Sequence, residues 1–421
     1  MQIPGICIPF LILRRRTMMK RHSLLVALLL VFALIGIPVF AQTQIRISGW
    51  PGNPDEEAAI KAMVDAFNAK NKDIVMVWEP TPGDYNQTLK TRLAGGTAAD
   101  LFYLDVSAFE EFARSGNLLP LDSYLKDGTL KDFPQPLIDG FTFNSRIYGI
   151  AKDFSTLSVL YNKEIFDKAK VPYPKDGMTY AEFIKMLETL KAKGVANPMI
   201  INADFNRMIP FIIANGGRVT DDNMNIAFAE PKAKAAIQMY VDIYKKGLGV
   251  EASSVGAGWE GEAFGKEQVA LIMSGPWCLG YLKGSFPNVY KKLGVVEMPQ
   301  GTKKSTMIYT VSWSINKQTK NRAAAITALK FLVSEGQKIF VEKAGVLASN
   351  RTIAAQDKDP IKVPFYKGAE YGTAWRIKTP SGLFSRANDE INSRIKDAFY
   401  GKLSVDDLVK QVTENYDSWV E

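Results

Sequence analysis

Strand-type and helix-type segments alternate along most of this chain, and this alternation constrains the fold more than any other feature. After residue 41 an alternating strand pattern covers 44–48, a Gly/Pro-rich break follows, and a helix pattern begins at Pro54 with apolar residues at 3.6-residue spacing. The unit then repeats through expected strands and helices at 74–78, 84–93, 101–104 and 106–114. Such alternation predicts mainly parallel sheets covered on both faces by helices.

The same alternation continues to the C-terminus. A capping box, Thr179 with Glu182, precedes an apolar helical stripe, and Gly247 and Gly401 follow helix patterns as stop signals. Further expected strands are 158–161, 199–201, 269–273 and 307–315, and further expected helices are 231–246, 321–332, 388–400 and 404–419. The 380 residues after the leader exceed one ordinary hydrophobic core, so two domains are predicted.

Residues 1–41 have the pattern of a secretory signal peptide. A basic segment at 18–22 precedes an uncharged apolar run at 24–37, and Val39-Phe40-Ala41 provides a small-residue cleavage site. We expect cleavage after Ala41 and a true start at Met18 or Met19. The alternative is an uncleaved membrane anchor, although the run is short for a span of about 20 residues. The first residue after the cut is Gln42 and not Cys, so the pattern does not suggest a lipid anchor and favours a periplasmic, secreted product.

Removing this leader limits the chemistry that the protein can perform. The only histidine is His22, so a mature chain has neither a Ser-His-Asp triad nor an HExxH zinc site. Cys7 is lost as well, and Cys278 then has no partner for an internal disulfide. Five basic residues leave with the leader, which lowers the formal net charge from +8 to +3. That balance gives no reason to expect a nucleic acid or an anionic membrane as a partner, and no cofactor or metal site is predicted.

Polar and aromatic residues follow several of the expected strands. In open α/β sheets, ligands bind beyond the carboxyl ends of strands, close to helix N-termini. That rule selects the segments 50–53 (with Trp50 and Asn53), 105–107 (Asp105), 153–156 (Asp153), 204–206 (Asp204 and Asn206) and 274–277 (Trp277). The residues named in these segments are candidate ligand-binding residues.

Four tryptophans, Trp50, Trp259, Trp277 and Trp375, lie in polar or Gly-rich segments. An indole face beside carboxylates and amides suits a sugar, because the C–H face of the ring stacks while the hydroxyls form hydrogen bonds. A buried structural role is the alternative for each of them. We read the other tryptophans, Trp78, Trp313 and Trp419, as core residues because they sit in regular elements.

Paired carboxylates could instead indicate a glycoside hydrolase. Asp105, Asp153 and Asp204 are isolated in the sequence, and no neighbour marks one of them as a general acid. A lone Asp after a strand is more often a helix cap or a ligand hydrogen-bond acceptor. We therefore expect a protein that is not an enzyme, and keep a secreted glycoside hydrolase as the alternative from another class.

Several short motifs occur in a characteristic order along nearly the whole mature chain. They are Ala66-Phe67-Asn68, the segment 93–101 (LAGGTAADL), the segment 116–122 (GNLLPLD), Tyr148-Gly149-Ile150, the segment 160–163 (LYNK), Asn215-Gly216-Gly217, Gly275-Pro276-Trp277 and the segment 298–301 (MPQG). In this order and spacing the chain resembles the family 1 extracellular solute-binding proteins of bacterial ABC importers, the group that includes maltose-binding protein.

The resemblance implies an α/β fold of the type II periplasmic binding protein kind. Each of its two lobes is expected to be a mainly parallel sheet flanked by helices, and ligand would bind between them. Hinge crossovers would lie near Asp153, Val296 and Val346. The implied division is a leader at 1–41, an N-terminal lobe at 42–152 plus 298–345, and a C-terminal lobe at 153–297 plus 346–421.

The resemblance also implies roles for single residues. Trp277 falls on the family's sugar-stacking Trp, Asp105 on an acid that binds hydroxyls, and Asp204 with Asn206 on ligand-contacting positions. Two departures concern the ligand's identity rather than the family: Arg386 and Asn388 stand where some sugar binders carry an aromatic, and Ala151 replaces the usual proline.

The implied function is that of a periplasmic substrate-binding protein for a mono- or oligosaccharide, closing around its ligand and delivering it to the membrane permease subunits of an ABC importer. We expect a monomer. Other solutes within the same class, namely a polyol, a phosphorylated polyol, an iron complex or a polyamine, remain alternatives.

Overall fold

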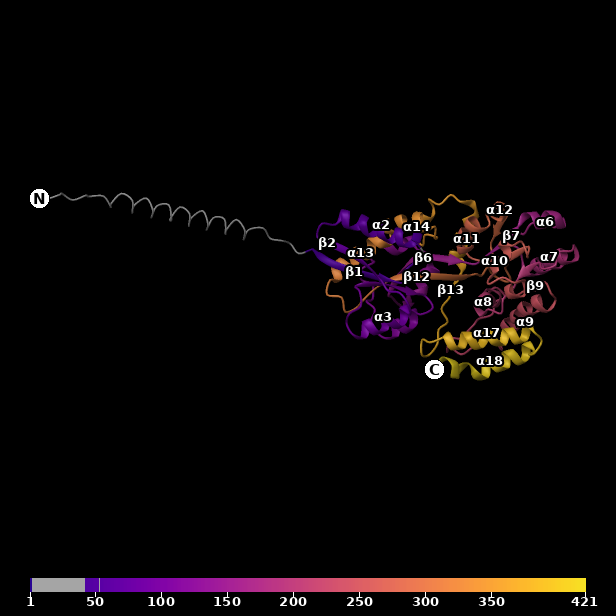
Figure 1. Cartoon of the computed structure of the whole chain (residues 1–421). Helices are drawn as coiled ribbons and strands as arrows, with labels where there is room; N and C mark the ends of the chain where they lie inside the picture. Colours follow the sequence, from indigo (N-terminus) through magenta and orange to yellow (C-terminus); the bar gives the residue numbers. More distant parts are fainter. Residues whose placement is uncertain (2–41, 53) are drawn as a thin grey trace. The chain divides into compact units, whose positions relative to one another are not determined.

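The computed structural model describes residue 1, residues 42–52 and residues 54–421 (Figure 1). The predicted signal peptide and Asn53 therefore lie outside the described residues. The body of the chain, from Gln44 to Glu421, forms one compact unit. No helix within the described ranges is both long enough and apolar enough to cross a membrane.

Two sheets organise this body. The first has the strand order β13 (Thr373–Ala374), β12 (Met307–Ile315), β3 (Leu101–Asp105), β1 (Thr43–Gly49) and β2 (Ile74–Pro80), and β6 (Gly149–Thr156) also pairs with β12. The second has the order β11 (Leu293–Val296), β7 (Ser158–Asn162), β10 (Leu271–Ser274), β8 (Met199–Ile200) and β9 (Gly249–Val250). A short hairpin joins β4 (Thr142–Phe143) to β5 (Arg146–Ile147).

Both sheets are mixed, which corrects the expectation of mainly parallel pairing in each lobe. In the first sheet β1 runs parallel to β3, but β12 is antiparallel to both β3 and β6. In the second sheet β8 runs parallel to β9 and β10, but β7 is antiparallel to β10 and β11. The antiparallel strands β7 and β12 are those at which the chain enters one sheet from the other, so they run against the strands formed by local strand–helix units.

Helices cover the sheets in the alternation that the sequence predicts. Their bounds are α2 Pro54–Lys70, α3 Tyr85–Ala94, α4 Phe109–Arg114, α5 Gln135–Gly140, α6 Lys163–Ala169, α7 Tyr180–Ala192, α8 Phe205–Ala214, α9 Pro231–Lys245, α10 Glu260–Gly265, α11 Trp277–Ser285, α12 Pro287–Tyr290, α13 Arg322–Leu332, α14 Glu335–Ala344, α15 Arg351–Ala354, α16 Val363–Tyr371, α17 Ser385–Phe399 and α18 Val405–Val420. In Figure 1, α17 and α18 lie beneath α8 and α9 of the second sheet.

Local signals explain where several helices begin. Thr179 and Glu182 form the predicted capping box, with Glu182 N donating to Thr179 Oγ1 at 3.2 Å and Thr179 N to Glu182 Oε2 at 2.8 Å. Ser404 caps α18 through Asp407 N at 3.0 Å. The helix expected from residue 106 begins only at Phe109, because Asp105 accepts a hydrogen bond from Ser107 N and holds a turn there. The helix expected from 388 begins three residues earlier, at Ser385.

The core residues follow the apolar patterns. Ile60, Met63 and Phe67 of α2 are buried, as is Trp313 of β12, while Trp419 is nearly so and Trp78 only partly. Cys278 is buried in α11, and burial raises the pKa of its thiol to about 12. A thiolate is therefore disfavoured at neutral pH.

The chain passes between the two sheets at distinct places. It leaves the first sheet after β6 and enters β7 across Leu157, and it returns between β11 and β12 across residues 297–306. Near the third expected crossing, Leu347 forms an antiparallel bridge with Phe154. The first sheet thus includes 153–156 and 373–374, which the expected division assigns to the C-terminal lobe. In Figure 1 the long strands β6 and β12 run from one sheet toward the other.

Candidate functional site

Two carboxylates flank the same residue of strand β12. Val311 lies opposite Asp105 of β3 on one side and opposite Asp153 of β6 on the other. Residues directly opposite each other in antiparallel strands place their side chains on one face of the sheet. Tyr309 lies two residues before Val311 and shares that face, because side chains alternate along a strand. The fold thus brings together two acids that stand 48 positions apart in the sequence.

Asp105 ends β3 in a half-buried position. Its Oδ1 accepts hydrogen bonds from Ser107 N at 2.8 Å and Ser107 Oγ at 2.5 Å. Burial raises the pKa of the Asp105 carboxyl above its ordinary value, the bonds from Ser107 oppose that change, and the charge of Asp153 adds to it. Burial therefore makes the ionised form of the Asp105 carboxyl less favourable than it is in water.

The N-terminus of α8 meets β12 from the second sheet. Asp204 caps the helix, accepting hydrogen bonds from Asn206 N at 3.1 Å and Asn206 Nδ2 at 2.5 Å. The Tyr309 hydroxyl donates to Asn206 Oδ1. Arg207 Nη1 donates to Tyr309 Oη at 2.5 Å and to Asn206 Oδ1 at 2.9 Å. Tyr309 consequently connects the face that carries Asp105 and Asp153 to the second sheet.

A buried ion pair completes this part of the site. Arg207 Nη2 donates to Glu260 Oε1 at 2.9 Å, and Ser274 Oγ donates to the same oxygen at 3.1 Å. Burial lowers the pKa of Arg207, but Tyr309 and Glu260 raise it above its ordinary value. Burial raises the pKa of Asp204, an effect that Arg207 opposes. Arg207 therefore stays charged and orients its neighbours.

Trp277 stands beside this network with much of its ring uncovered. It opens α11 and is 39% exposed, whereas its neighbour Cys278 is buried. Its ring meets Tyr309 edge to face at 5.6 Å, and the Arg207 guanidinium lies 5.8 Å from its centroid. An exposed indole held beside charged and amide groups has the properties of a stacking platform.

The structure places the other candidate residues less centrally. Trp50 packs edge-on against Tyr85 and Tyr103 at centroid distances of 5.3 and 5.2 Å. Trp259 meets Tyr281 at 4.8 Å. Each of these tryptophans is partly buried within an aromatic cluster.

Trp375 and Arg386 belong to the C-terminal part of the chain. Trp375 follows β13 and packs against Phe205 at 6.1 Å and Phe384 at 5.9 Å. Arg386 is exposed and donates from Nη1 to the Ser418 carbonyl at 3.2 Å. This hydrogen bond ties Arg386 to α18.

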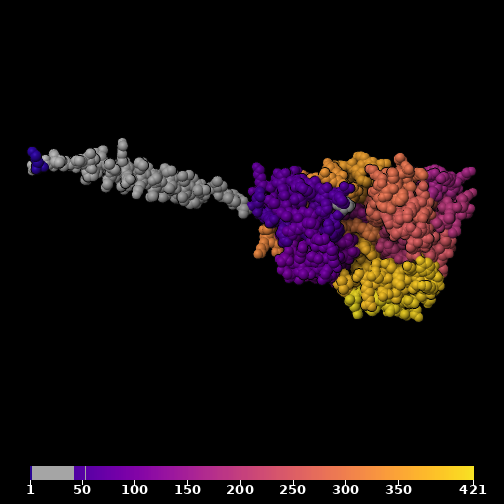
Figure 2. All heavy atoms as spheres, viewed as in Figure 1, coloured from indigo at the N-terminus to yellow at the C-terminus, as the bar shows by residue number. Residues whose placement is uncertain are grey.

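A hollow of about 450 Å³ lies between α3 and α4 on one side and residues 375–388 on the other. Ser107, Trp375, Phe384 and Asn388 are among its lining residues, and the buried Asn388 Oδ1 atom has no hydrogen-bond partner among the described residues. Figure 2 shows the surface hollowed between the purple atoms of the first part of the chain and the yellow C-terminal atoms. Since Ser107 also holds Asp105, this hollow adjoins the paired carboxylates.

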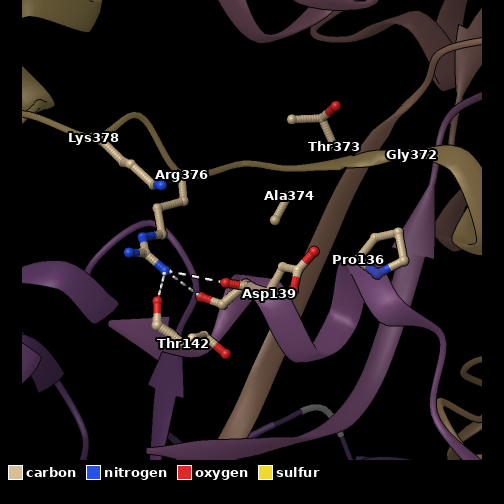
Figure 3. A pocket seen from close by; sticks show the side chains of 9 residues that line it. Pro136, Asp139, Thr142, Gly372, Thr373, Ala374, Arg376 and Lys378 are labelled. Atoms are coloured by element: carbon tan, nitrogen blue, oxygen red, sulfur yellow. Dashed lines mark hydrogen bonds between the residues drawn. The ribbon is translucent and has the colours of Figure 1, made fainter. Parts of the chain in front are cut away.

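A second hollow, of about 410 Å³, lies where residues 372–378 cross α5 and β4 (Figure 3). Its main cation, Arg376, already donates from Nη1 to the carbonyls of Asp139 at 3.3 Å, Gly140 at 3.1 Å and Thr142 at 2.8 Å. These contacts attach the C-terminal segment to α5 and β4. They leave this guanidinium less free to bind a ligand than the groups around Trp277.

Sequence reasoning missed three residues that organise the site: Arg207, Glu260 and Tyr309. Glu260 and Tyr309 contact Arg207 from 53 and 102 positions away. No local pattern marks such partners. The one signal in the sequence that could have pointed to Arg207 is its position three residues after Asp204, a candidate ligand-binding residue. Within the described residues, no group of three or more His, Cys, Asp or Glu could hold a metal ion.

Comparison with known proteins identifies the family of this chain. Residues 51–339 match the bacterial extracellular solute-binding protein family, and the chain belongs to that family. A lactose-binding protein of Rhizobium radiobacter is 22% identical over 396 residues, which cover 88% of this chain and 92% of the relative.

Solved structures show the same fold. The sugar-binding protein MalE of Xanthomonas citri matches with a TM-score of 0.81 at 20% identity, covering 90% of this chain and 97% of that one. The cyclic α-maltosyl-1,6-maltose binding protein of Arthrobacter globiformis matches with a TM-score of 0.78 at 19% identity, covering 90% and 99%. These matches confirm the predicted family and the two-lobe, type II periplasmic binding protein fold.

Replacing the Asp105 carboxylate by its neutral isostere is expected to stabilise the ligand-free protein at neutral pH. The pKa of Asp105 is raised by folding, so its contribution to stability is present below the unfolded pKa and is lost as pH rises through the folded pKa. The Asp105→Asn midpoint in urea should exceed the wild-type midpoint at about pH 7, and the difference should shrink toward about pH 4. The amide keeps an oxygen for Ser107.

The matched control is Asp65→Asn, which alters an exposed carboxylate paired with Lys61. Its midpoint should change little at either pH, since exposed ion pairs contribute only about 0–1 kcal/mol. An Asp105→Asn midpoint equal to or below wild type at neutral pH would contradict the burial argument.

Proposed function

We propose that this chain is the substrate-binding protein of an ABC importer and that it takes a mono- or oligosaccharide between its two sheets. The observation that carries this proposal is the exposed Trp277 ring beside the Tyr309–Asn206–Arg207 network, which joins elements of both sheets. A pyranose can stack its C–H face on such a ring. Its hydroxyls can bond to the carboxylate and amide groups nearby.

The charge of the site favours a neutral sugar over a phosphorylated polyol. The groups that the structure gathers around β12 and α8 comprise four carboxylates and two cations: Asp105, Asp153, Asp204, Glu260, Lys152 and Arg207. An anionic ligand would meet excess negative charge, and the two cations already have carboxylate partners. Similarity to a lactose-binding protein and to a maltosyl-maltose binding protein supports the same ligand class.

Further assignments belong to the same proposal. Trp277, Asp105, Asp153, Asp204 and Asn206 form the centre of the binding site. Trp50, Trp259, Trp375 and Arg386 supply its periphery, and Asn53, which lies outside the described residues, stays a predicted ligand contact. The two lobes divide at 42–152 plus 298–345 and 153–297 plus 346–421.

The mechanism of the proposal is closure of one lobe on the other. A ligand that contacts both lobes stabilises the closed state relative to the open state, and the membrane permease then recognises the closed form. We infer a monomer that is exported to the periplasm by the leader at 1–41, carries no lipid anchor, and performs no catalysis on its ligand.

Thermal unfolding of the purified protein with a panel of sugars tests the proposal. A ligand that binds only the folded state adds about 2.7 kcal/mol at 100 times its Kd. We expect a clear rise in Tm with at least one of lactose, maltotriose, mannotriose or D-tagatose, and no rise with a polyol phosphate. No shift with any sugar would refute the sugar assignment, and release of cleaved saccharide would favour the glycoside hydrolase instead.

A further inference from the structure

Strand β6 contains a β-bulge at the candidate site. Along β12, Val311 lies opposite Asp153 and the next residue, Ser312, lies opposite Ala151, so Lys152 has no partner in the ladder. Successive side chains of a regular strand point to opposite faces. An extra residue breaks that alternation and redirects a side chain, and such bulges are frequent beside functional sites.

The bulge brings Lys152 to the face that carries the carboxylates. Its ammonium group forms an ion pair with the adjacent Asp153, with side-chain exposures of only 9% and 16%. Lys152 Nζ also lies 4.9 Å from the ring centroid of Tyr103. Tyr103 shares a sheet face with Asp105, two residues further along β3.

Buried polar groups hold the backbone of the bulge in place. Gln337 of α14 donates from Nε2 to the Lys152 carbonyl at 2.9 Å and to Ser349 Oγ at 2.7 Å. Ser349 Oγ in turn donates to the Ala151 carbonyl at 2.6 Å. Both side chains are 1% exposed. The Ala151 and Lys152 carbonyls at the bulge therefore have hydrogen-bond donors from the protein.

Aromatic rings and one carboxylate surround the Lys152 ammonium group. Phe340 of α14 covers it, with Nζ 4.0 Å from the ring centroid, and Tyr103 lies on another side. The ammonium group forms its ion pair with Asp153. A buried lysine between two rings and one carboxylate fixes that carboxylate, because leaving either charge unpaired is costly.

We propose that Lys152 is a positioning residue for ligand binding: the bulge turns its ammonium group onto the ligand-facing side of the sheet, where it holds the Asp153 carboxylate across β12 from Asp105. This inference rests on the proposed function, since it treats Asp153 as a ligand-binding group. Lys152 acts through Asp153 and needs no contact with the sugar. It keeps the Asp153 carboxylate available as a hydroxyl acceptor in a buried setting.

A double-mutant cycle on the full protein tests this role. The probe is whichever of lactose, maltotriose, mannotriose or D-tagatose the wild type binds most tightly, and affinity is measured by calorimetric titration. Lys152→Met should weaken binding by about 10- to 100-fold, the scale for disturbing one charged hydrogen bond. In an Asp153→Asn background, the same Lys152→Met change should alter affinity by less than about 2-fold, because the residue through which it acts is already neutral.

Three outcomes separate this inference from its alternatives. Multiplicative losses in the double variant would show that Lys152 acts independently of Asp153 and would overturn the inference. Unchanged affinity of Lys152→Met would overturn it as well, while leaving sugar binding intact. A wild-type protein that binds none of the four sugars would overturn the proposed function itself.

Further measurements distinguish a loss of affinity from a loss of folding. Lys330→Met removes a lysine from an exposed pair with Asp127 and should leave affinity unchanged. Urea midpoints establish that each variant is folded under the titration conditions. If Lys152→Met alone does not fold, comparing Asp153→Asn with the double variant, in which no unpaired charge remains, still decides the question: a further loss of affinity beyond about 2-fold contradicts the inference.

Discussion

Arg376→Met is expected to lower the free energy of unfolding by about 1–3 kcal/mol, the scale for leaving buried hydrogen-bonding groups unsatisfied, since Glu110 keeps its ion pair with Arg114. Arg376 Nε donates to Glu110 Oε2 at 3.2 Å, and the two side chains are only 6% and 3% exposed. Its Nη1 serves the three carbonyls seen in Figure 3, which would lose a donor together. Equilibrium unfolding in urea measures the loss.

Arg351→Met is the matched control for this experiment. Arg351 also pairs with a glutamate, Glu370, and also donates from Nη1 to two backbone carbonyls, but its ion pair is 43% and 51% exposed. The ion pair itself should contribute about 0–1 kcal/mol there. If both variants lost the same free energy of unfolding, burial of the Arg376–Glu110 pair would not explain its contribution to stability.

Trp277→Ala is expected to weaken sugar binding by about 1–3 kcal/mol, or roughly 10- to 100-fold in Kd, on the scale measured for bases stacked on aromatic side chains. Stability should change little, since the ring is 39% exposed and its removal leaves no closed cavity. Trp277→Phe should lie between wild type and alanine, because it retains a smaller stacking face. Titration calorimetry together with urea unfolding separates the two effects.

Tyr173→Ala is a suitable control for the tryptophan variant. Tyr173 is an aromatic residue of similar exposure, 41%. It contacts Tyr161 of β7 and Phe166 and Asp167 of α6, none of which belongs to the Tyr309–Asn206–Arg207 network. Its removal should leave affinity unchanged. If Trp277→Ala instead loses stability and keeps its affinity, the ring is a structural element and the sugar binds elsewhere.

Local signals in the sequence predicted much of the fold. Capping residues such as Thr179 and Ser404 begin helices where expected, and the alternation of apolar residues locates most strands within a few positions. The direction of β7 and β12 could not be read in this way. It depends on the chain passing from one sheet to the other, and no local pattern encodes that passage.

In the candidate site, too, residues with a local signal were predictable, and residues that depend on long-range contacts were not. Asp105, Asp204 and Trp277 were predictable because each follows a strand or opens a helix. Arg207, Glu260 and Tyr309 form their hydrogen bonds across distant parts of the sequence, and the role of Lys152 depends on a single shift in register between β6 and β12. Such features arise from tertiary pairing and become visible only in the folded chain.

The most direct test of the account is a crystal structure of the protein with the sugar that stabilises it most. We predict a saccharide ring stacked on Trp277, with hydroxyls bonded to Asp105 or Asp153 from the first sheet and to the Asp204–Asn206 segment from the second. A sugar bound in the hollow beside Arg376, or one that contacts residues of only one sheet, would contradict the claim that ligand binds between the two sheets.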